Sequence, residues 1–199
     1  MDPAKPADPH LVEHTLQQDE LLRGRFLHVV RDTVRLPDGS QATREYVVHP
    51  GAVMVIPLLD DGRLVMERQW RHPIGQVMTE FPAGKLDPGE GELACARREL
   101  LEETGYTARE WARAGQLHPV ISYATEFIAI WFARGLSRGP AKLDADEFLE
   151  VVTATPEELM AGCRDGRITD AKTLVGALWL QQVLSGSWVL DWQAQSSLP

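Results

Sequence analysis

The sequence predicts an α+β domain preceded by an antiparallel β extension. Strand-like segments joined by turn sequences occur on both sides of one helical run at 92–104, and the chain ends in two further helical segments. A length of 199 residues suits one domain with a substantial core. We therefore expect a flexible tail at 1–10, an antiparallel extension at 11–48 and the main domain at 49–199.

Turn sequences and apolar patterns predict the strands of the extension and of the main domain. The turn sequence PDGS separates two strand-like segments, RFLHVVRDTVRL and QATREYVVHP, and such a turn is typical of antiparallel neighbours. A second hairpin, GAVMVIPLL with RLVMERQW, surrounds Asp60, Asp61 and Gly62, and its apolar strands should be central. A short strand follows near Val77–Phe81. Beyond the helix, WARAGQLHPV, EFIAIWFARGL and FLEVVTA also predict strands.

Each predicted helix has a recognisable beginning or end. Gly105 follows the run at 92–104 and is the residue type that most often ends a helix. Thr155, Pro156 and Glu158 form an N-cap, a first-turn proline and a capping-box glutamate. Asp170 should cap the last helix, AKTLVGALWLQQVL, which stops at the following Ser-Gly pair.

Charge and composition exclude several classes of protein. The formal net charge is −9, which disfavours a protein that wraps nucleic acid. Cys95 and Cys163 are too few and too far apart for a disulfide framework or a cysteine metal site. The N-terminus lacks the apolar core of a secretory signal, and the longest apolar run, AVMVIPLL, is too short to span a bilayer. We expect a cytoplasmic protein without membrane or nucleic-acid partners.

Three glutamates crowd the end of the first helix. Steps of 100° per residue place Glu99, Glu102 and Glu103 on an arc opposite the apolar face that carries Leu100. Carboxylates about 6 Å apart repel by roughly 2–3 kcal/mol per pair at an effective dielectric constant near 20. Bound divalent cations such as Mg²⁺ would turn this repulsion into attraction, and a diphosphate would supply further oxygen ligands.

The surrounding residues resemble a complete Nudix box. Gly84, Glu90, Arg98-Glu99-Leu100, Glu102-Glu103 and Gly105-Tyr106 occupy its nine fixed positions at the family spacing, with Tyr106 at a place where the family more often has an aliphatic residue. The resemblance implies a Nudix fold, in which a mixed β-sheet is sandwiched between helices, and metal-assisted hydrolysis of a diphosphate.

The resemblance also implies a role for each residue of the box. Glu99 and Glu103 would be the main ligands of Mg²⁺ or Mn²⁺. Glu102 would be a third ligand with a possible catalytic part, and the backbone carbonyl of Ala83 would be a fourth. Structural roles would fall to Gly84, Glu90, Arg98 and Gly105, with Arg98 and Glu90 joining the loop to the helix through charge-assisted hydrogen bonds.

Outside the box, three stretches resemble the ADP-ribose pyrophosphatase branch of the family: REYVVHPGAV, ERQWRHPIG and EFPAGKLDPGE. This branch implies a homodimer whose N-terminal strands help to build the partner's adenine site. The substrate-binding residues that it implies are Arg71, Arg44, Glu45, Phe26, Arg25 and Glu126. The branch usually has a serine-proline-glycine turn after the box, whereas this chain has HPVISYATE, which leaves room for another nucleoside diphosphate sugar.

The catalytic base of this branch comes late in the chain. Glu147 in LDADEFLEV matches its place, and the neighbouring Asp144, Asp146 and Glu150 are alternatives. We expect hydrolysis of ADP-ribose to AMP and ribose 5-phosphate. The alternatives are hydrolysis of another nucleoside diphosphate sugar such as GDP-mannose, and a Nudix-fold sensor that binds a nucleotide without cleaving it. The intact set of glutamates argues against the sensor.

Overall fold

The computed structural model describes residues 8–140 and 148–194, which form two compact units. Of the described residues, the first unit contains those up to His49 together with Val120–Glu126, and the second contains the others. The segment Val120–Glu126 belongs to the first unit through two backbone hydrogen bonds, from Val47 to Tyr123 and from Thr125 to Val47. The predicted division at residue 48 did not include this segment, because its attachment depends on contacts between residues far apart in the sequence.

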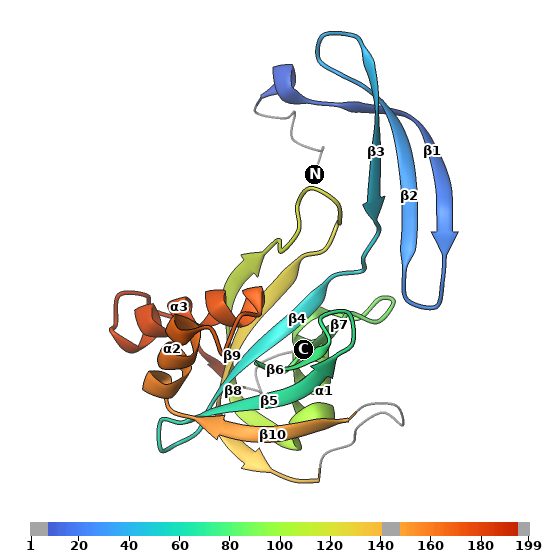
Figure 1. The fold of residues 1–199 in the computed structure, drawn as a ribbon. Helices are drawn as coiled ribbons and strands as arrows, with labels where there is room; N and C mark the ends of the chain where they lie inside the picture. Colours follow the sequence, from blue (N-terminus) through green and yellow to red (C-terminus); the bar gives the residue numbers. More distant parts are fainter. Residues whose placement is uncertain (1–7, 141–147, 195–199) are drawn as a thin grey trace. The chain divides into compact units, whose positions relative to one another are not determined.

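The first unit is a three-stranded antiparallel sheet in the order β1-β2-β3 (Figure 1). A short 3-10 helix at Pro9–Leu11 precedes it. The strands are β1 (His14–Arg23), β2 (His28–Arg35) and β3 (Gln41–Val47). The buried side chains of the middle strand are Val30, Asp32 and Val34. The predicted turn PDGS joins β2 to β3.

The second unit is built on a mixed sheet with the strand order β10-β5-β4-β9-β8-β11. Strands β4 and β9 are parallel, and the other pairs are antiparallel. Short strands β6 and β7 pair with β5 and β4. The strand bounds are β4 Ala52–Leu58, β5 Leu64–Arg71, β6 Gln76–Glu80, β7 Ala83–Lys85, β8 Tyr106–Leu117, β9 Ile128–Arg138, β10 Leu149–Ala154 and β11 Gln193–Ala194.

Three helices cover the two faces of this sheet (Figure 1). Helix α1 (Glu92–Thr104) covers one face, where Val53, Val55 and Leu100 belong to one buried cluster. Helices α2 (Pro156–Asp165) and α3 (Ala171–Leu184) cover the other face, where Met54, Ile56 and Leu180 share a second cluster. The predicted α+β fold, a mixed sheet between helices with an antiparallel N-terminal extension, is therefore confirmed.

The predicted helix ends are present. Gly105 ends α1 in the left-handed region with φ of 74°, a conformation that glycine adopts without steric cost. Thr155 and Glu158 form both hydrogen bonds of the capping box, and the side chain of Asp170 accepts a hydrogen bond from Thr173 N. Within residues 8–140 and 148–194, every helix is too short or too polar to cross a membrane.

Candidate active site

The carboxylates of α1 do not all lie on its outer face. Glu102 is partly exposed, but Glu103 is only 3% exposed and lies among the buried residues of the helix. The prediction that Glu103 lies opposite the apolar face was therefore wrong. Glu103 follows Leu100 by three residues, so it lies at the border of the apolar stripe, and the sheet covers that border.

Arg98 connects this helix to the loop before it. Its guanidinium donates hydrogen bonds of 2.9 and 2.8 Å to the two oxygens of Glu90, and a further one of 3.1 Å to the backbone oxygen of Lys85. It also donates to Glu99 at 2.8 Å and to Glu102 at 3.1 Å. The hydrogen bonds and charge of Arg98 lower the pKa of Glu90 to about 2. One cation thus offsets part of the repulsion among the clustered carboxylates.

Glycine at position 84 leaves room for a carboxylate. A Cβ atom at Gly84 would lie 1.9 Å from both Cδ and Oε1 of Glu99, far inside van der Waals contact. The Glu99 carboxylate therefore lies directly over the backbone of β7. Any larger residue at position 84 would displace this side chain.

The carboxylate of Glu103 is also held by β7. Its Oε2 accepts a hydrogen bond of 3.0 Å from Ala83 N. Glu99 and Glu103 consequently face the same two-residue stretch, Ala83-Gly84. Hard anionic oxygens fit Mg²⁺ or Mn²⁺, so the donor set suits the metal that the box implies. In the described part of the chain, no three acidic, histidine or cysteine side chains already converge closely enough to hold an ion.

A buried charge network adjoins this region. Arg71 donates hydrogen bonds of 2.7 and 2.9 Å to the two oxygens of Glu80, which is 2% exposed. Lys172 donates to Glu80 and, at 3.0 Å, to Asp170. Arg71, the predicted substrate residue of this unit, therefore has a structural partner. A cavity of about 480 Å³ is lined by residues that include Arg71, Glu80 and Lys172.

Glu67 is a fully buried carboxylate that the sequence analysis did not single out. It pairs directly across the strands with Glu80 and lies next to Glu103. Burial raises the pKa of Glu67 well above its usual range, and the negative charge of Glu80 acts in the same direction. The only signal in the sequence was one glutamate after three apolar residues in a strand predicted to be central.

The other predicted substrate residues belong to the first unit. Phe26 is 65% exposed and Arg25 is exposed. Arg44, on β3, donates hydrogen bonds to both oxygens of Glu13. Glu45 accepts hydrogen bonds from Arg31, and Glu126 lies 4.0 Å from a ring nitrogen of His49. The predicted base Glu147 lies outside the described residues, as do Asp144 and Asp146.

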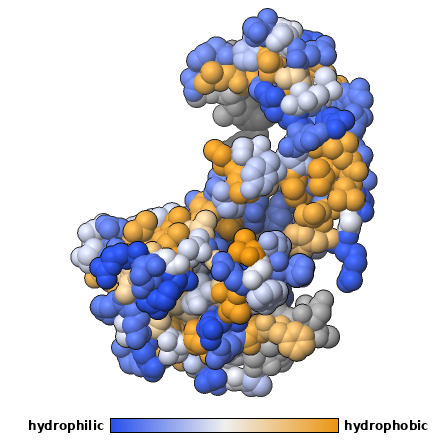
Figure 2. Space-filling model, in the orientation of Figure 1, coloured by the Kyte–Doolittle hydropathy of each residue, from blue (hydrophilic) through white to orange (hydrophobic). Residues whose placement is uncertain are grey.

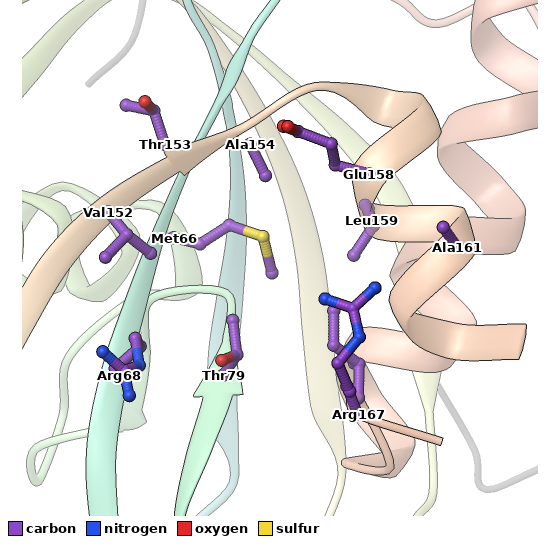
Figure 3. Close-up of a pocket in the computed structure, with 11 residues that line it drawn as sticks. Met66, Arg68, Thr79, Val152, Thr153, Ala154, Glu158, Leu159, Ala161 and Arg167 are labelled. Atoms are coloured by element: carbon purple, nitrogen blue, oxygen red, sulfur yellow. The ribbon is translucent and has the colours of Figure 1, made fainter. Parts of the chain in front are cut away.

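A second cavity, of about 650 Å³, lies between strands β5, β6 and β10 and helix α2 (Figure 3). Its lining combines apolar side chains such as Met66 and Leu159 with the arginines Arg68 and Arg167. Arg68 bonds Glu150, and Arg167 bonds Asp165. None of the predicted site residues lines this cavity.

Comparisons with known proteins identify the family. A model described as the NUDIX domain matches residues 48–174, and one described as the nucleoside diphosphate sugar hydrolase N-terminal domain matches residues 13–47. The chain is 38% identical over 173 residues to the methanol dehydrogenase activator of Bacillus methanolicus, which covers 85% of this chain and 92% of that protein.

An ADP-ribose pyrophosphatase of Bacillus subtilis is 36% identical over 173 residues, or 86% of this chain and 94% of that protein. The crystal structure of an ADP compounds hydrolase has a TM-score of 0.79 at 24% identity over 88% of this chain and 95% of that one, which shows a shared fold. The first family model alone spans more than half of the sequence and includes the whole glutamate box. The chain therefore belongs to the Nudix family.

Proposed function

We propose that this Nudix hydrolase cleaves the diphosphate bond of a nucleoside diphosphate sugar, and that ADP-ribose is split into AMP and ribose 5-phosphate. The observation that carries the proposal is the pair of carboxylates, Glu99 and Glu103, held against the backbone of Ala83-Gly84. The relative named ADP-ribose pyrophosphatase and the N-terminal family model support the choice of substrate class.

The metal would be Mg²⁺ or Mn²⁺. Glu99, Glu102 and Glu103 would hold it with their carboxylates, and Ala83 with its backbone carbonyl. When bound, the metal neutralises the diphosphate, polarises phosphorus and lowers the pKa of an attacking water. The chain positions these groups through Gly84, which leaves room for Glu99, and through Arg98, which fixes the helix against the loop.

Other residues would orient the substrate and move the proton. Arg71 lines a cavity and remains partly exposed, so its guanidinium can face a phosphate or the terminal ribose while it also bonds Glu80. Glu147 is the proposed catalytic base. Glu102 could share this role, because its side chain is the most exposed among the carboxylates of the box on α1. We place the enzyme in the cytoplasm.

A homodimer is part of the proposal. Side chains of the first unit expose apolar surface that an isolated sheet cannot bury, and Figure 2 shows hydrophobic residues gathered over these strands. The exposed residues on β1 and the turn that follows it are Leu16, Leu21, Leu22, Phe26 and Leu27. A second copy that covers this surface would bring Arg25, Phe26, Arg44 and Glu45 to the adenine of its partner's substrate. Glu126 would lie near the distal sugar.

A substrate panel tests the proposal. The purified protein and Mg²⁺ are incubated with ADP-ribose, ADP-glucose and GDP-mannose, and the products are separated by ion-exchange chromatography. We expect the highest kcat/KM for ADP-ribose, with AMP as a product. A higher kcat/KM for GDP-mannose would support a hydrolase with a different substrate. If none of the three compounds releases product, the proposal of a hydrolase is wrong and a nucleotide sensor that does not cleave its ligand is favoured.

A further inference from the structure

The side chain of Glu67 points to the face of the sheet that α1 covers. Successive side chains of a strand alternate between faces, and Val65 belongs to the cluster around α1 whereas Met66 belongs to the cluster around α2 and α3. Two residues after Val65, Glu67 shares its face. The buried carboxyl of Glu103 on α1 lies beside it.

The carboxyl of Glu67 interacts with the carboxyl of Glu103, and no other group of the described residues donates to its oxygens. Neither oxygen accepts a hydrogen bond from an N–H or hydroxyl group of the described residues, and the side chain is 0% exposed. The two cations of the network, Arg71 and Lys172, donate to Glu80 instead. A buried carboxyl whose one close partner is another acid is costly, and an aliphatic residue such as Val65 would fill the same position at no such cost.

We infer that Glu67 is a further carboxylate of the metal site, which binds the divalent cation from β5 together with Glu103 from α1. This inference rests on the proposed function, because it needs a cation at Glu103. Arg71 and Lys172 donate to Glu80, so a cation between Glu67 and Glu103 would supply the positive charge in direct contact with these two carboxylates. Carboxylate oxygens are the ligands that Mg²⁺ and Mn²⁺ prefer. Three carboxylates of the box would then be joined by a fourth from β5.

A metal ligand and a packing residue at position 67 predict different effects of its replacement on stability with and without the metal. In the metal-free protein, Glu67 is a buried acid beside the acidic groups of Glu80 and Glu103, so its neutral replacement should not lower stability. In the metal-bound protein, the same replacement removes a ligand. The wild type should therefore gain more stability from Mn²⁺ than the variant does.

The test measures Mn²⁺ binding to the purified full chain by electron paramagnetic resonance, without substrate. We expect Glu67→Gln to weaken Mn²⁺ binding by roughly tenfold or more. The control Glu110→Gln removes one negative charge from β8, where Glu110 bonds Arg134, and should leave the affinity within about twofold. Thermal unfolding in a chelator should show Glu67→Gln and Glu67→Val at or above the wild-type Tm, with a smaller rise on addition of Mn²⁺.

Two results would overturn the inference. Glutamine can still donate a hydrogen bond to Glu103, so an unchanged Mn²⁺ affinity in Glu67→Gln would mean that Glu67 only shares a proton with Glu103. An equal loss of Tm with and without Mn²⁺ would mean a packing role. The variant Glu103→Gln separates this inference from the proposed function: if Glu103→Gln also binds Mn²⁺ normally, the metal site itself is wrongly placed.

Discussion

Arg98 and Glu90 form a bidentate ion pair, in which Nε and Nη2 of the guanidinium donate at 2.9 and 2.8 Å to the two carboxylate oxygens. The pair joins the middle of α1 to the loop that follows β7. The same guanidinium also reaches Glu99 and Glu102, so one side chain fixes both the loop and the two outer carboxylates. Its geometry matches a planar carboxylate, which a lysine could not reproduce.

The stability that this pair provides should depend on pH. The pKa of Glu90 is lowered from 4.5 to about 2 in the folded protein, so its contribution is complete above pH 4.5 and is lost as the pH falls towards 2. We expect Glu90→Gln to lower the free energy of unfolding by on the order of 2–3 kcal/mol at pH 7, with the difference shrinking below pH 4.5. Urea unfolding at several pH values measures it.

Asp87→Asn is the control for this experiment. Asp87 lies 3.9 Å from Arg98, but its side chain is 73% exposed, so its loss should change stability by less than about 0.5 kcal/mol. A difference between Glu90→Gln and the wild type that stays constant from pH 7 to pH 3 would contradict the assignment.

Replacement of Gly84 by alanine should damage the site more than the fold. The added Cβ would collide with the Glu99 carboxylate, which must then leave the backbone of β7. We expect Gly84→Ala to lower kcat/KM by about tenfold or more, since small displacements of a catalytic group have large effects on rate. Gly91→Ala is the matched control, because a Cβ there meets nothing within 4 Å. Equal activity of the two variants would show that Glu99 does not need its present position.

Two arginines of β5 should respond differently to lysine. Arg71 bonds the buried Glu80 through two N–H groups, whereas Arg68 makes an exposed pair with Glu150. We expect Arg71→Lys to lower the free energy of unfolding by about 1–2 kcal/mol, towards the lower end of this range because Arg71 is partly exposed. Arg68→Lys should lower it by less than about 0.5 kcal/mol. Chemical unfolding compares them. If Arg71 also contacts the substrate, only its variant raises KM.

The capping box of α2 offers a prediction that concerns stability alone. The hydroxyl of Thr155 accepts a hydrogen bond from Glu158 N at 3.1 Å. Thr155→Ala should therefore lower the free energy of unfolding by about 1 kcal/mol, and Thr155→Ser should restore most of it. Differential scanning calorimetry measures both variants. A fall in kcat for Thr155→Ala at a temperature where it is fully folded would reveal a role for α2 that the structure does not suggest.

Local signals made much of the fold predictable from the sequence. Gly105, Thr155 and Asp170 act on backbone groups within a few residues of themselves, so their roles as helix ends follow from sequence alone. The box at 84–106 likewise has a fixed spacing. The prediction of the family depended on this spacing and is confirmed by the family model.

Contacts between distant segments were not predictable in the same way. The burial of Glu67 follows from its register with Glu80 on the next strand and from the cover that α1 gives that face, and neither is encoded near Glu67. The burial of Glu103 likewise depends on how α1 packs against the sheet. The pairing of Arg71 with Glu80 also depends on strand register, so sequence alone left open whether this arginine is solvated.

The central claim is that the carboxylates of α1 hold a divalent metal that supports hydrolysis of a diphosphate. Its most direct test measures AMP released from ADP-ribose by the wild type and by Glu103→Gln over a range of Mg²⁺ concentrations. We expect hydrolysis by the wild type to require Mg²⁺ and kcat/KM of Glu103→Gln to fall by about a hundredfold or more. Equal rates for the two proteins, or hydrolysis that persists in excess chelator, would contradict the claim.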